Sequence, residues 1–306
     1  MKIVLLDAQT FGDSDLSGFD ALGDVSVYAT TSADETLERV KDADVIVTNK
    51  VVIDDKVMMG SAHLKLICVA ATGMNNIDLE AASRRNISVK NVAGYSTDSV
   101  IQHTFSMLFY LMGQSRYYDE YVKSGEYTKS PVFTNIERPF SEIKGKKWGI
   151  IGLGSIGKGV ANIAKAFGAE VRYYSTSGKN NSSEFEKVSF TELLEGSDII
   201  SIHAPLNSMT DGLLHQSELL QLKDGAFLLN LGRGGIINED ALAPCMEAKE
   251  LYIGLDVLAQ EPMREGHPLL NIANPERLYI TPHIAWASAE ARTTLIASVI
   301  ENIKSL

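Results

Sequence analysis

A glycine-rich segment, KWGIIGLGSIGKGVANIAKAFG, constrains the fold of this chain more than any other feature. Gly152, Gly154 and Gly157 form the pattern G-x-G-x-x-G between an apolar strand-like run and a segment with helical spacing. The first glycine allows a tight turn, the second lets a pyrophosphate approach, and the third lets the helix pack on the strand. The N–H groups at the helix start, Ser155 and Ile156, would face the phosphates. The alternative is a glycine-rich turn without a ligand.

The rest of the chain alternates short apolar runs with helical patterns, which predicts parallel sheets covered by helices on both faces. The first third holds such runs at residues 2–6, 25–28, 44–48, 66–70 and 87–91. The pattern restarts with about six more, at 147–151, 170–174, 198–202, 226–230, 252–256 and 278–280. A length of 306 residues suggests two domains, so each series is expected to form one sheet.

Two helical segments lie outside these series. A long one is expected from about Thr97 to Lys123, and its nearly all-apolar middle predicts a buried helix between the domains. The irregular segment 124–143 that follows is expected to cross the surface. The amphipathic stretch SAEARTTLIASVIENI comes late in the chain and could return to the first domain.

Composition argues against several classes of function. The net charge of −11 disfavours binding to nucleic acid or to an anionic membrane surface, which needs clustered Lys and Arg. Cys68 and Cys245 are too few for a zinc site or a disulfide framework, and no metal is expected. No segment reaches the roughly 18 apolar residues of a membrane span, and the N-terminal apolar run is too short for a secretory signal. A cytoplasmic location is therefore expected.

The end of the strand at 170–174 bears on the choice of dinucleotide. An acidic residue there would bind the ribose hydroxyls of NAD. This chain has Ser175 instead, followed by Thr176, Ser177 and Lys179. Hydroxyls and a lysine could bind the 2′-phosphate of NADP, but NAD could also bind without the acid. The sequence leaves NAD and NADP open.

Three charged residues each follow a later strand. Arg233 lies between glycines in NLGRGG, Glu261 precedes a proline in GLDVLAQEP, and His283 follows a proline in ITPHIAWAS. Ligands of doubly wound sheets bind beyond the carboxyl ends of the strands, so these side chains could converge on one cleft. Taken singly, they could be a surface ion pair, a turn acid and a loop histidine.

With these motifs in view, the chain resembles the D-isomer-specific 2-hydroxyacid dehydrogenases over nearly its whole length. The resemblance rests on ATGMNNID, NVAGYSTDSVIQHTF, GKKWGIIGLGSIGK, SIHAPLNSMTDGLL, LKDGAFLLNLGRGG, GLDVLAQEP and PHIAW, in the family's order. Within the family, TNK at 48–50, ATGMNN and GYSTDSVIQHTF look most like the glycerate dehydrogenases, also called hydroxypyruvate reductases.

The resemblance implies an α/β fold with two doubly wound parallel sheets and a split arrangement. Residues 1–97 and 285–306 would form a flavodoxin-like substrate domain. The Rossmann domain that binds NAD or NADP, residues 98–284, would be inserted between them. A homodimer is also implied, with the dinucleotide domains and the long helix in the interface.

The resemblance further implies reduction of a 2-oxo acid, in which a hydride reaches the carbonyl carbon and a proton reaches its oxygen. His283 is the residue able to donate that proton near neutral pH. Glu261 would orient the imidazole and stabilise its protonated form. Arg233 would bind the substrate carboxylate through its planar guanidinium and polarise the carbonyl.

The remaining assignments rest on the same resemblance. The turn formed by Thr72, Gly73 and Met74 would bind the substrate carboxylate, and Trp286 would line that pocket unless it belongs to the core. Asn49 and Lys50 could face the same cleft, and the alternative for Lys50 is a solvated lysine at a strand end. Asp256 would bind the nicotinamide carboxamide unless it caps a helix. Further cofactor contacts are expected from Thr97, Val100, Ala204, Pro205, Thr210, Arg233, His283 and Ala285.

The sequence thus predicts an NAD(P)-dependent D-2-hydroxyacid dehydrogenase that acts on hydroxypyruvate and D-glycerate. Glyoxylate or another 2-oxo acid is the alternative within the class, because pocket side chains decide that choice. A protein that senses the dinucleotide without turnover is the alternative from another class. The residues interpreted as structural are His103 and His203, with Tyr117, Tyr118 and Tyr121 as packing or dimer contacts.

Overall fold

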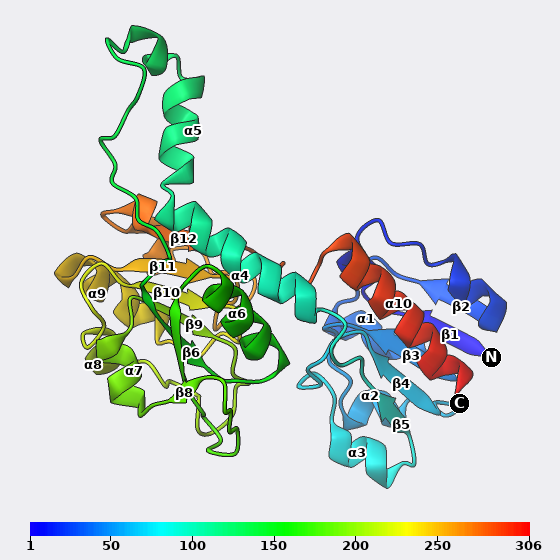
Figure 1. Cartoon of the computed structure of the whole chain (residues 1–306). Coiled ribbons are helices and arrows are strands. Elements are labelled where there is room, and N and C mark those ends of the chain that lie inside the picture. Colours follow the sequence, from blue (N-terminus) through cyan, green and yellow to red (C-terminus); the bar gives the residue numbers. More distant parts are fainter. The chain divides into compact units, whose positions relative to one another are not determined.

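The computed structural model describes all residues from Met1 to Leu306, and they form two compact α/β units. The first unit contains Met1–Ser96 with Ala287–Leu306, and the second contains Thr97–Trp286 (Figure 1). The expected junctions, 97/98 and 284/285, lie one and two residues from this division. None of the helices combines the length and the apolar character that a membrane crossing requires.

A parallel sheet in the order β2-β1-β3-β4-β5 forms the centre of the first unit. Its strands are β1 (Lys2–Leu5), β2 (Asp24–Val27), β3 (Val45–Thr48), β4 (Leu66–Val69) and β5 (Ser88–Lys90). Every residue of β3 and β4 is buried, as expected of central strands with helices on both faces. The order is the flavodoxin-like one, with its switch point between β1 and β3.

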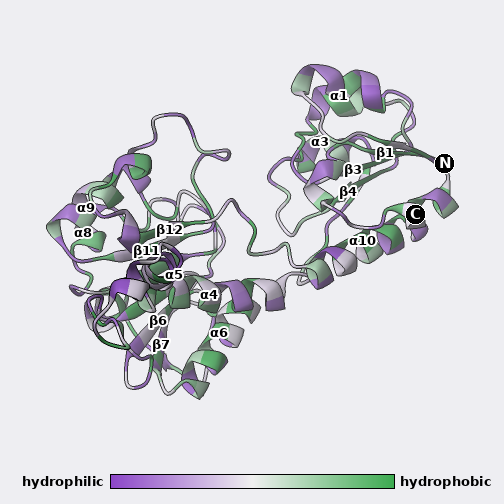
Figure 2. Ribbon diagram, turned by 90° about the horizontal axis from the view of Figure 1, so that it is seen from above, coloured by the Kyte–Doolittle hydropathy of each residue, from purple (hydrophilic) through white to green (hydrophobic).

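Helices cover this sheet on both faces. Val40, Met58 and Ala82 join one core with strand residues, from the helices α1 (Ala33–Val40), α2 (Asp55–Met59) and α3 (Leu79–Arg84). The C-terminal helix α10 (Ala289–Lys304) contacts β4 and the 3-10 turn η2 (Ser17–Leu22). Hydrophobic and hydrophilic residues alternate along α10, and the apolar ones are buried at helical spacing (Figure 2).

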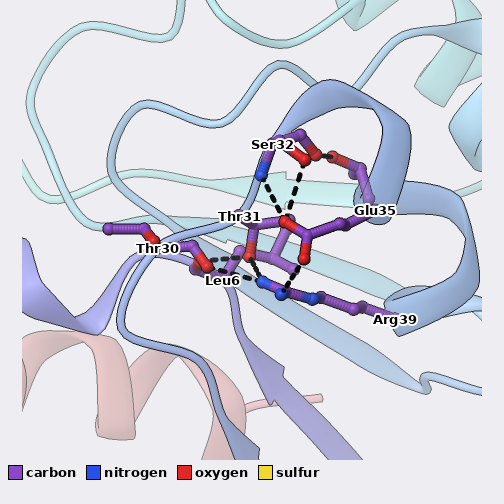
Figure 3. A network of polar contacts seen from close by, with 7 residues as sticks. Leu6, Thr30, Thr31, Ser32, Glu35 and Arg39 are labelled. Atoms are coloured by element: carbon purple, nitrogen blue, oxygen red, sulfur yellow. Dashed lines mark hydrogen bonds and ion pairs between the residues drawn. The ribbon is translucent and has the colours of Figure 1, made fainter.

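A polar network closes the loop between β2 and α1 (Figure 3). Ser32 and Glu35 form a capping box at the start of α1, and Glu35 also pairs with Arg39 at 2.6 Å. Arg39 donates to Thr31 Oγ1 at 2.6 Å, and Thr31 in turn donates to Leu6 O. The network therefore ties this loop to the end of β1.

The second unit contains a parallel sheet in the order β12-β11-β10-β9-β6-β7-β8. Its strands are β6 (Lys147–Ile151), β7 (Glu170–Tyr174), β8 (Glu186–Lys187), β9 (Ile199–Ile202), β10 (Phe227–Asn230), β11 (Tyr252–Leu255) and β12 (Leu278–Ile280). The predicted runs match six of them to within one residue. The seventh, β8, is a two-residue exposed edge strand that the sequence analysis missed.

Helices also cover both faces of this sheet. One core lies beneath α4 (Thr97–Met112) and α6 (Ser155–Ala166) and includes Trp148. The other core contains residues of α7 (Phe190–Gly196), α8 (Gln216–Leu219) and α9 (Leu242–Ala248).

The segment from Thr97 to Lys123 is helical as predicted, but the prediction of one continuous helix is wrong. α4 ends at Met112, and a separate helix, α5, runs from Ser115 to Lys123. Between them Gln114 adopts φ 50°, a left-handed conformation that ends an α-helix. Half of α4 is buried, but α5 has no buried residue and extends away from the sheet of its own unit (Figure 1).

Candidate active site

The glycine-rich turn lies at the switch point of the second sheet, between β6 and β9. Gly152 has φ 93°, and a Cβ there would lie 2.9 Å from Ala204 N. A Cβ on Gly157 would lie 2.2 Å from Gly152 O, so only glycine lets α6 come this close. A Cβ on Gly154 would meet no atom within 4 Å, so the space beside the helix start is open.

The start of α6 suits an anionic ligand. Gly154 is its N-cap and supplies no side-chain cap, and the first turn carries no acidic residue. Ser155 is exposed there, and Ile156 packs partly on the core. The open space and the uncapped N–H groups therefore fit the pyrophosphate of a dinucleotide.

The loop after β7 carries the predicted ribose-side residues. Ser175 is 4% exposed, and its hydroxyl accepts the N–H of Asn180 at 3.2 Å, so it closes this loop from within. Thr176 is partly exposed, and Ser177 and Lys179 are exposed. The loop thus offers hydroxyl and ammonium donors at its surface.

The loop after β9 is shaped by Thr210. Its side chain is fully buried, and its hydroxyl donates to Pro205 O at 2.6 Å and accepts the N–H of Asn207 at 2.9 Å. Ala204 is buried and Pro205 is exposed. Thr210 therefore acts inside the loop rather than through an exposed hydroxyl.

His203 lies at the start of the same loop. Its Nε2 is 3.0 Å from Ser201 Oγ, and its Nδ1 is buried without a partner. Burial lowers the pKa of His203 to about 3, so the ring is neutral near pH 7.

Arg233, Glu261 and His283 follow three neighbouring parallel strands, β10, β11 and β12, and so lie at one edge of the sheet. Asn230, the last residue of β10, braces the first loop by donating to Arg233 O at 2.9 Å. A Cβ on Gly234 would lie 1.9 Å from Leu258 O, so the loops after β10 and β11 are in direct backbone contact.

The structure brings Glu261 and His283 together. Glu261 Oε2 lies 2.7 Å from His283 Nδ1, and Glu261 Oε1 accepts the N–H of Leu258 at 2.9 Å. The side chains of His283 and Glu261 are 24% and 33% exposed, so a ligand can reach the pair. Because Nδ1 is engaged by the carboxylate, Nε2 is the nitrogen that can exchange a proton with a substrate.

Asp256 holds the loop that carries His283. The carboxylate is 2% exposed and accepts from Thr281 Oγ1 at 2.6 Å, Ile284 N at 2.9 Å and Ala285 N at 2.9 Å. Between these contacts His283 adopts φ 54° and donates its N–H to Asp256 O. Asp256 caps no helix, so that alternative is wrong. Its contact with a carboxamide stays a prediction.

The other predicted residues of this unit lie in or beside the core beneath α4. Val100 is 6% exposed and belongs to the core beneath α4, and Thr97 begins that helix. Ala285 is 2% exposed, and Trp286 packs partly on the same core. His103 Nε2 lies 3.1 Å from Thr281 Oγ1 and so adjoins the Asp256 contacts.

Five predicted substrate-side residues belong to the first unit. Asn49 is buried, and the N–H groups of Asn49 and Lys50 donate to the buried carboxylate of Asp7 at 2.7–3.0 Å. Thr72 is exposed after β4, Gly73 and Met74 are partly exposed, and Thr72 Oγ1 donates to Val92 O at 3.2 Å. Their contact with a substrate stays a prediction.

The second unit contains another histidine–glutamate pair, which was not predicted from the sequence. His267 Nε2 lies 3.2 Å from Glu239 Oε2, and both side chains are 8% exposed. The residues come from separate loops and follow no hydrophobic period. The only local signal is a histidine directly before Pro268, where it serves as the N-cap of a 3-10 turn.

Comparison with known proteins gives one family. The model of the D-isomer specific 2-hydroxyacid dehydrogenase NAD binding domain matches residues 105–285. Hydroxypyruvate reductase of Blautia hydrogenotrophica is 35% identical and aligns with 99% of this chain and 96% of its own. Glycerate dehydrogenase of Methylorubrum extorquens is 32% identical, over 99% of this chain and 95% of its own. The solved structure of an acyclic imino acid reductase, Bsp5, with NADPH and D-Arg is 32% identical, covers 100% of this chain and 96% of its own, and has a TM-score of 0.86.

Proposed function

The chain belongs to the D-isomer specific 2-hydroxyacid dehydrogenases, and from that premise we propose that it reduces hydroxypyruvate to D-glycerate. The predicted family, the α/β fold class and the reduction of a 2-oxo acid with NAD(P)H are confirmed by the similarities described above. The substrate and the roles of individual residues are the new part of the proposal.

The geometry supports His283 as the proton donor. The nicotinamide supplies the hydride that the substrate carbon receives. His283 then gives the Nε2 proton to the carbonyl oxygen, and the reverse reaction returns it. Glu261 fixes the ring through Nδ1, and Arg233 offers two parallel N–H donors to the substrate carboxylate. Thr72, Gly73 and Met74 of the first unit are also proposed as substrate-binding residues, through their N–H groups.

One observation carries this proposal: the 2.7 Å contact between Glu261 and His283, at the sheet edge that also carries Arg233. The test is oxidation of NADH and of NADPH by the purified protein, followed at 340 nm, with hydroxypyruvate, glyoxylate and pyruvate. Fastest turnover with hydroxypyruvate is expected. Faster turnover with glyoxylate would identify glyoxylate as the substrate in place of hydroxypyruvate. Dinucleotide binding without turnover would favour a protein that senses the dinucleotide.

Imine reduction is a second candidate, because the imino acid reductase is 32% identical over the whole chain. A protonated imine needs a hydride but no proton on the reacting nitrogen, whereas a ketone needs both. The His283–Glu261 pair therefore favours the ketone. Adding methylamine to each 2-oxo acid in the same assay separates the two, since an imine reductase would turn over only the mixture.

We also propose a homodimer, built on an arm formed by α5 and the segment 124–142. Phe133, Ile136 and Phe140 of this arm are 88%, 79% and 66% exposed. Exposed apolar side chains in one segment mark a protein–protein contact. Light scattering on the protein as it elutes from a size-exclusion column is expected to give twice the mass of the chain. The cytoplasm is the proposed location, because both cysteines are free and buried as in a reducing compartment.

A further inference from the structure

The peptide between Leu258 and Ala259 connects the predicted reactive residues. The N–H of Leu258, in the peptide immediately before it, donates to Glu261 Oε1 at 2.9 Å, and Glu261 in turn contacts His283. The backbone of Gly234 packs against the Leu258–Ala259 peptide itself, so closely that a Cβ there would lie 1.9 Å from Leu258 O. The position of these two adjacent peptides therefore sets Glu261 relative to the loop of Arg233.

Glu239 holds the Leu258–Ala259 peptide. Its Oε1 accepts the N–H of Ala259 at 2.5 Å, and its Oε2 faces His267 Nε2 at 3.2 Å. Both side chains are 8% exposed. Each carboxylate oxygen thus has a donor, as a buried carboxylate requires.

His267 holds Glu239 in turn. Its Nδ1 accepts the N–H of Leu269 at 3.3 Å, so the ring proton lies on Nε2 and points at Glu239. The pair ties together both ends of the loop 257–268, which carries Glu261 at its centre. An exposed pair, Asp240 with Arg264 at 3.5 Å, joins the same two segments from outside.

We propose that Glu239 and His267 are positioning residues of the reaction: through the Leu258–Ala259 peptide they hold Glu261 against His283 and in register with Arg233. The proposal rests on the proposed function, because it acts through Glu261. It assigns a role to a buried pair that is not among the predicted substrate or cofactor contacts.

The first test removes the carboxylate. Glu239→Ala is expected to lower kcat about 30-fold, as a displaced catalytic group does, with the NAD(P)H KM unchanged. Glu239→Gln is expected to recover most of the loss, because its amide oxygen can still accept the Ala259 N–H. Asp240→Ala is the matched control, since it removes the neighbouring exposed carboxylate, and it is expected to keep wild-type kcat.

Histidine variants separate the two contacts of His267. His267→Gln keeps a donor near Glu239 and is expected to stay close to wild type. His267→Asn keeps the acceptor for Leu269 but is too short to reach Glu239, and it is expected to lose activity as Glu239→Ala does. Both histidine variants retain polar atoms at position 267, so they can test the proposal if Glu239→Ala fails to fold. Equal activity of the two histidine variants would overturn the proposal.

A double-mutant cycle decides whether Glu239 acts through Glu261. In the Glu261→Gln background, Glu239→Ala is expected to cost less than about 3-fold, because the side chain it positions is already impaired. The same 30-fold loss in both backgrounds would mean a general structural role and would overturn the proposal. A wild-type kcat for Glu261→Gln alone would instead overturn the role of Glu261 in the reaction, and the positioning role of Glu239 and His267 with it.

Hydrogen exchange supplies a readout that does not depend on turnover. Glu239→Ala is expected to speed exchange of the Ala259 amide and leave the amides of β10 unchanged. Unaltered protection of Ala259 would show that Glu239 does not hold this peptide.

Discussion

The second unit contains two histidine–glutamate pairs that differ mainly in access. His283 and Glu261 are 2.7 Å apart, with side chains 24% and 33% exposed. His267 and Glu239 are 3.2 Å apart, and both are 8% exposed. In the first pair, Nε2 of the imidazole is available to a ligand. In the second pair, both ring nitrogens and both carboxylate oxygens contact other groups of the protein. The same two side chains can thus exchange a proton in one place and fix a loop in the other.

His203 extends the comparison to a histidine without a carboxylate. Its ring contacts only Ser201 through Nε2, and burial lowers its pKa to about 3. Burial alone keeps this imidazole neutral. The three histidines His283, His267 and His203 therefore differ in their partners and in their access to solvent. Variants at the three positions are expected to change different properties of the protein.

The largest expected effect is at the exposed pair. His283→Gln should lower kcat about 10³-fold, because the proton donor to the carbonyl oxygen is lost. Binding of NAD(P)H, measured by fluorescence titration, should stay within a factor of about 2, since the start of α6, which is proposed to bind the phosphates, is untouched. His283→Asn is a useful companion, because asparagine tolerates the left-handed backbone at this position. Full activity of either variant would contradict the assignment.

The next effect is at the carboxylate partner. Glu261→Gln should lower kcat about 100-fold, at the low end of the range for acid–base groups, because the imidazole keeps its Nε2 but loses the carboxylate that contacts its Nδ1. Steady-state assays across pH would show the loss. If Glu261→Gln equalled the Asp240→Ala control, the contact with His283 would be structural only.

The buried histidine should affect stability rather than turnover. The unfolded chain gains a proton on His203 below pH 6.5, whereas the folded chain does so only near pH 3. Stability is therefore lost as the pH falls below 6.5, by about 2 kcal/mol between pH 7 and pH 5. His203→Gln should remove this part of the pH dependence, measured by urea unfolding at both pH values. Equal pH dependence in variant and wild type would show that the ring is accessible to protons.

The smallest expected effect is at Ser175, where a substitution should change the preference between NADH and NADPH and leave the functions of the three histidines unchanged. Ser175→Asp should shift the ratio of kcat/KM values toward NADH about 10-fold, because a carboxylate repels the 2′-phosphate of NADPH. Asn at position 175 is the uncharged control. An unchanged ratio would place residue 175 away from the adenosine ribose, and the pH dependence of kcat should not change in either case.

The strands were the most predictable part of the fold. β6, β7 and β12 have the expected bounds, because each is a short run rich in aliphatic and aromatic residues between turn residues. β8 consists of Glu186 and Lys187 at the sheet edge, so no apolar run marks it. The break between α4 and α5 was not predicted, because the helix ends at the left-handed backbone of Gln114 and hydrophobic spacing does not reveal that conformation.

The site was predictable where a motif fixes it to a strand end. The strand-end positions of Arg233, Glu261 and His283 could be predicted because each follows an apolar run in a recognisable sequence context, and their roles in the reaction stay predictions. Glu239 and His267 were not, since they lie 28 residues apart in the chain and pair only through folding. The way Asp256 holds the loop of His283 was equally hidden, because its partners are two backbone N–H groups and a hydroxyl.

The left-handed backbone at His283 also limits how this position can change during evolution. Apart from glycine, His, Asn and Asp adopt that conformation more readily than other residues. Asn and Asp are each a single nucleotide substitution from a histidine codon, as are Tyr, Leu, Arg, Pro and Gln. A descendant of this chain that gave up turnover but kept its fold is thus expected to carry Asn or Asp at position 283. The other codon neighbours adopt this backbone conformation at a greater cost in the free energy of folding.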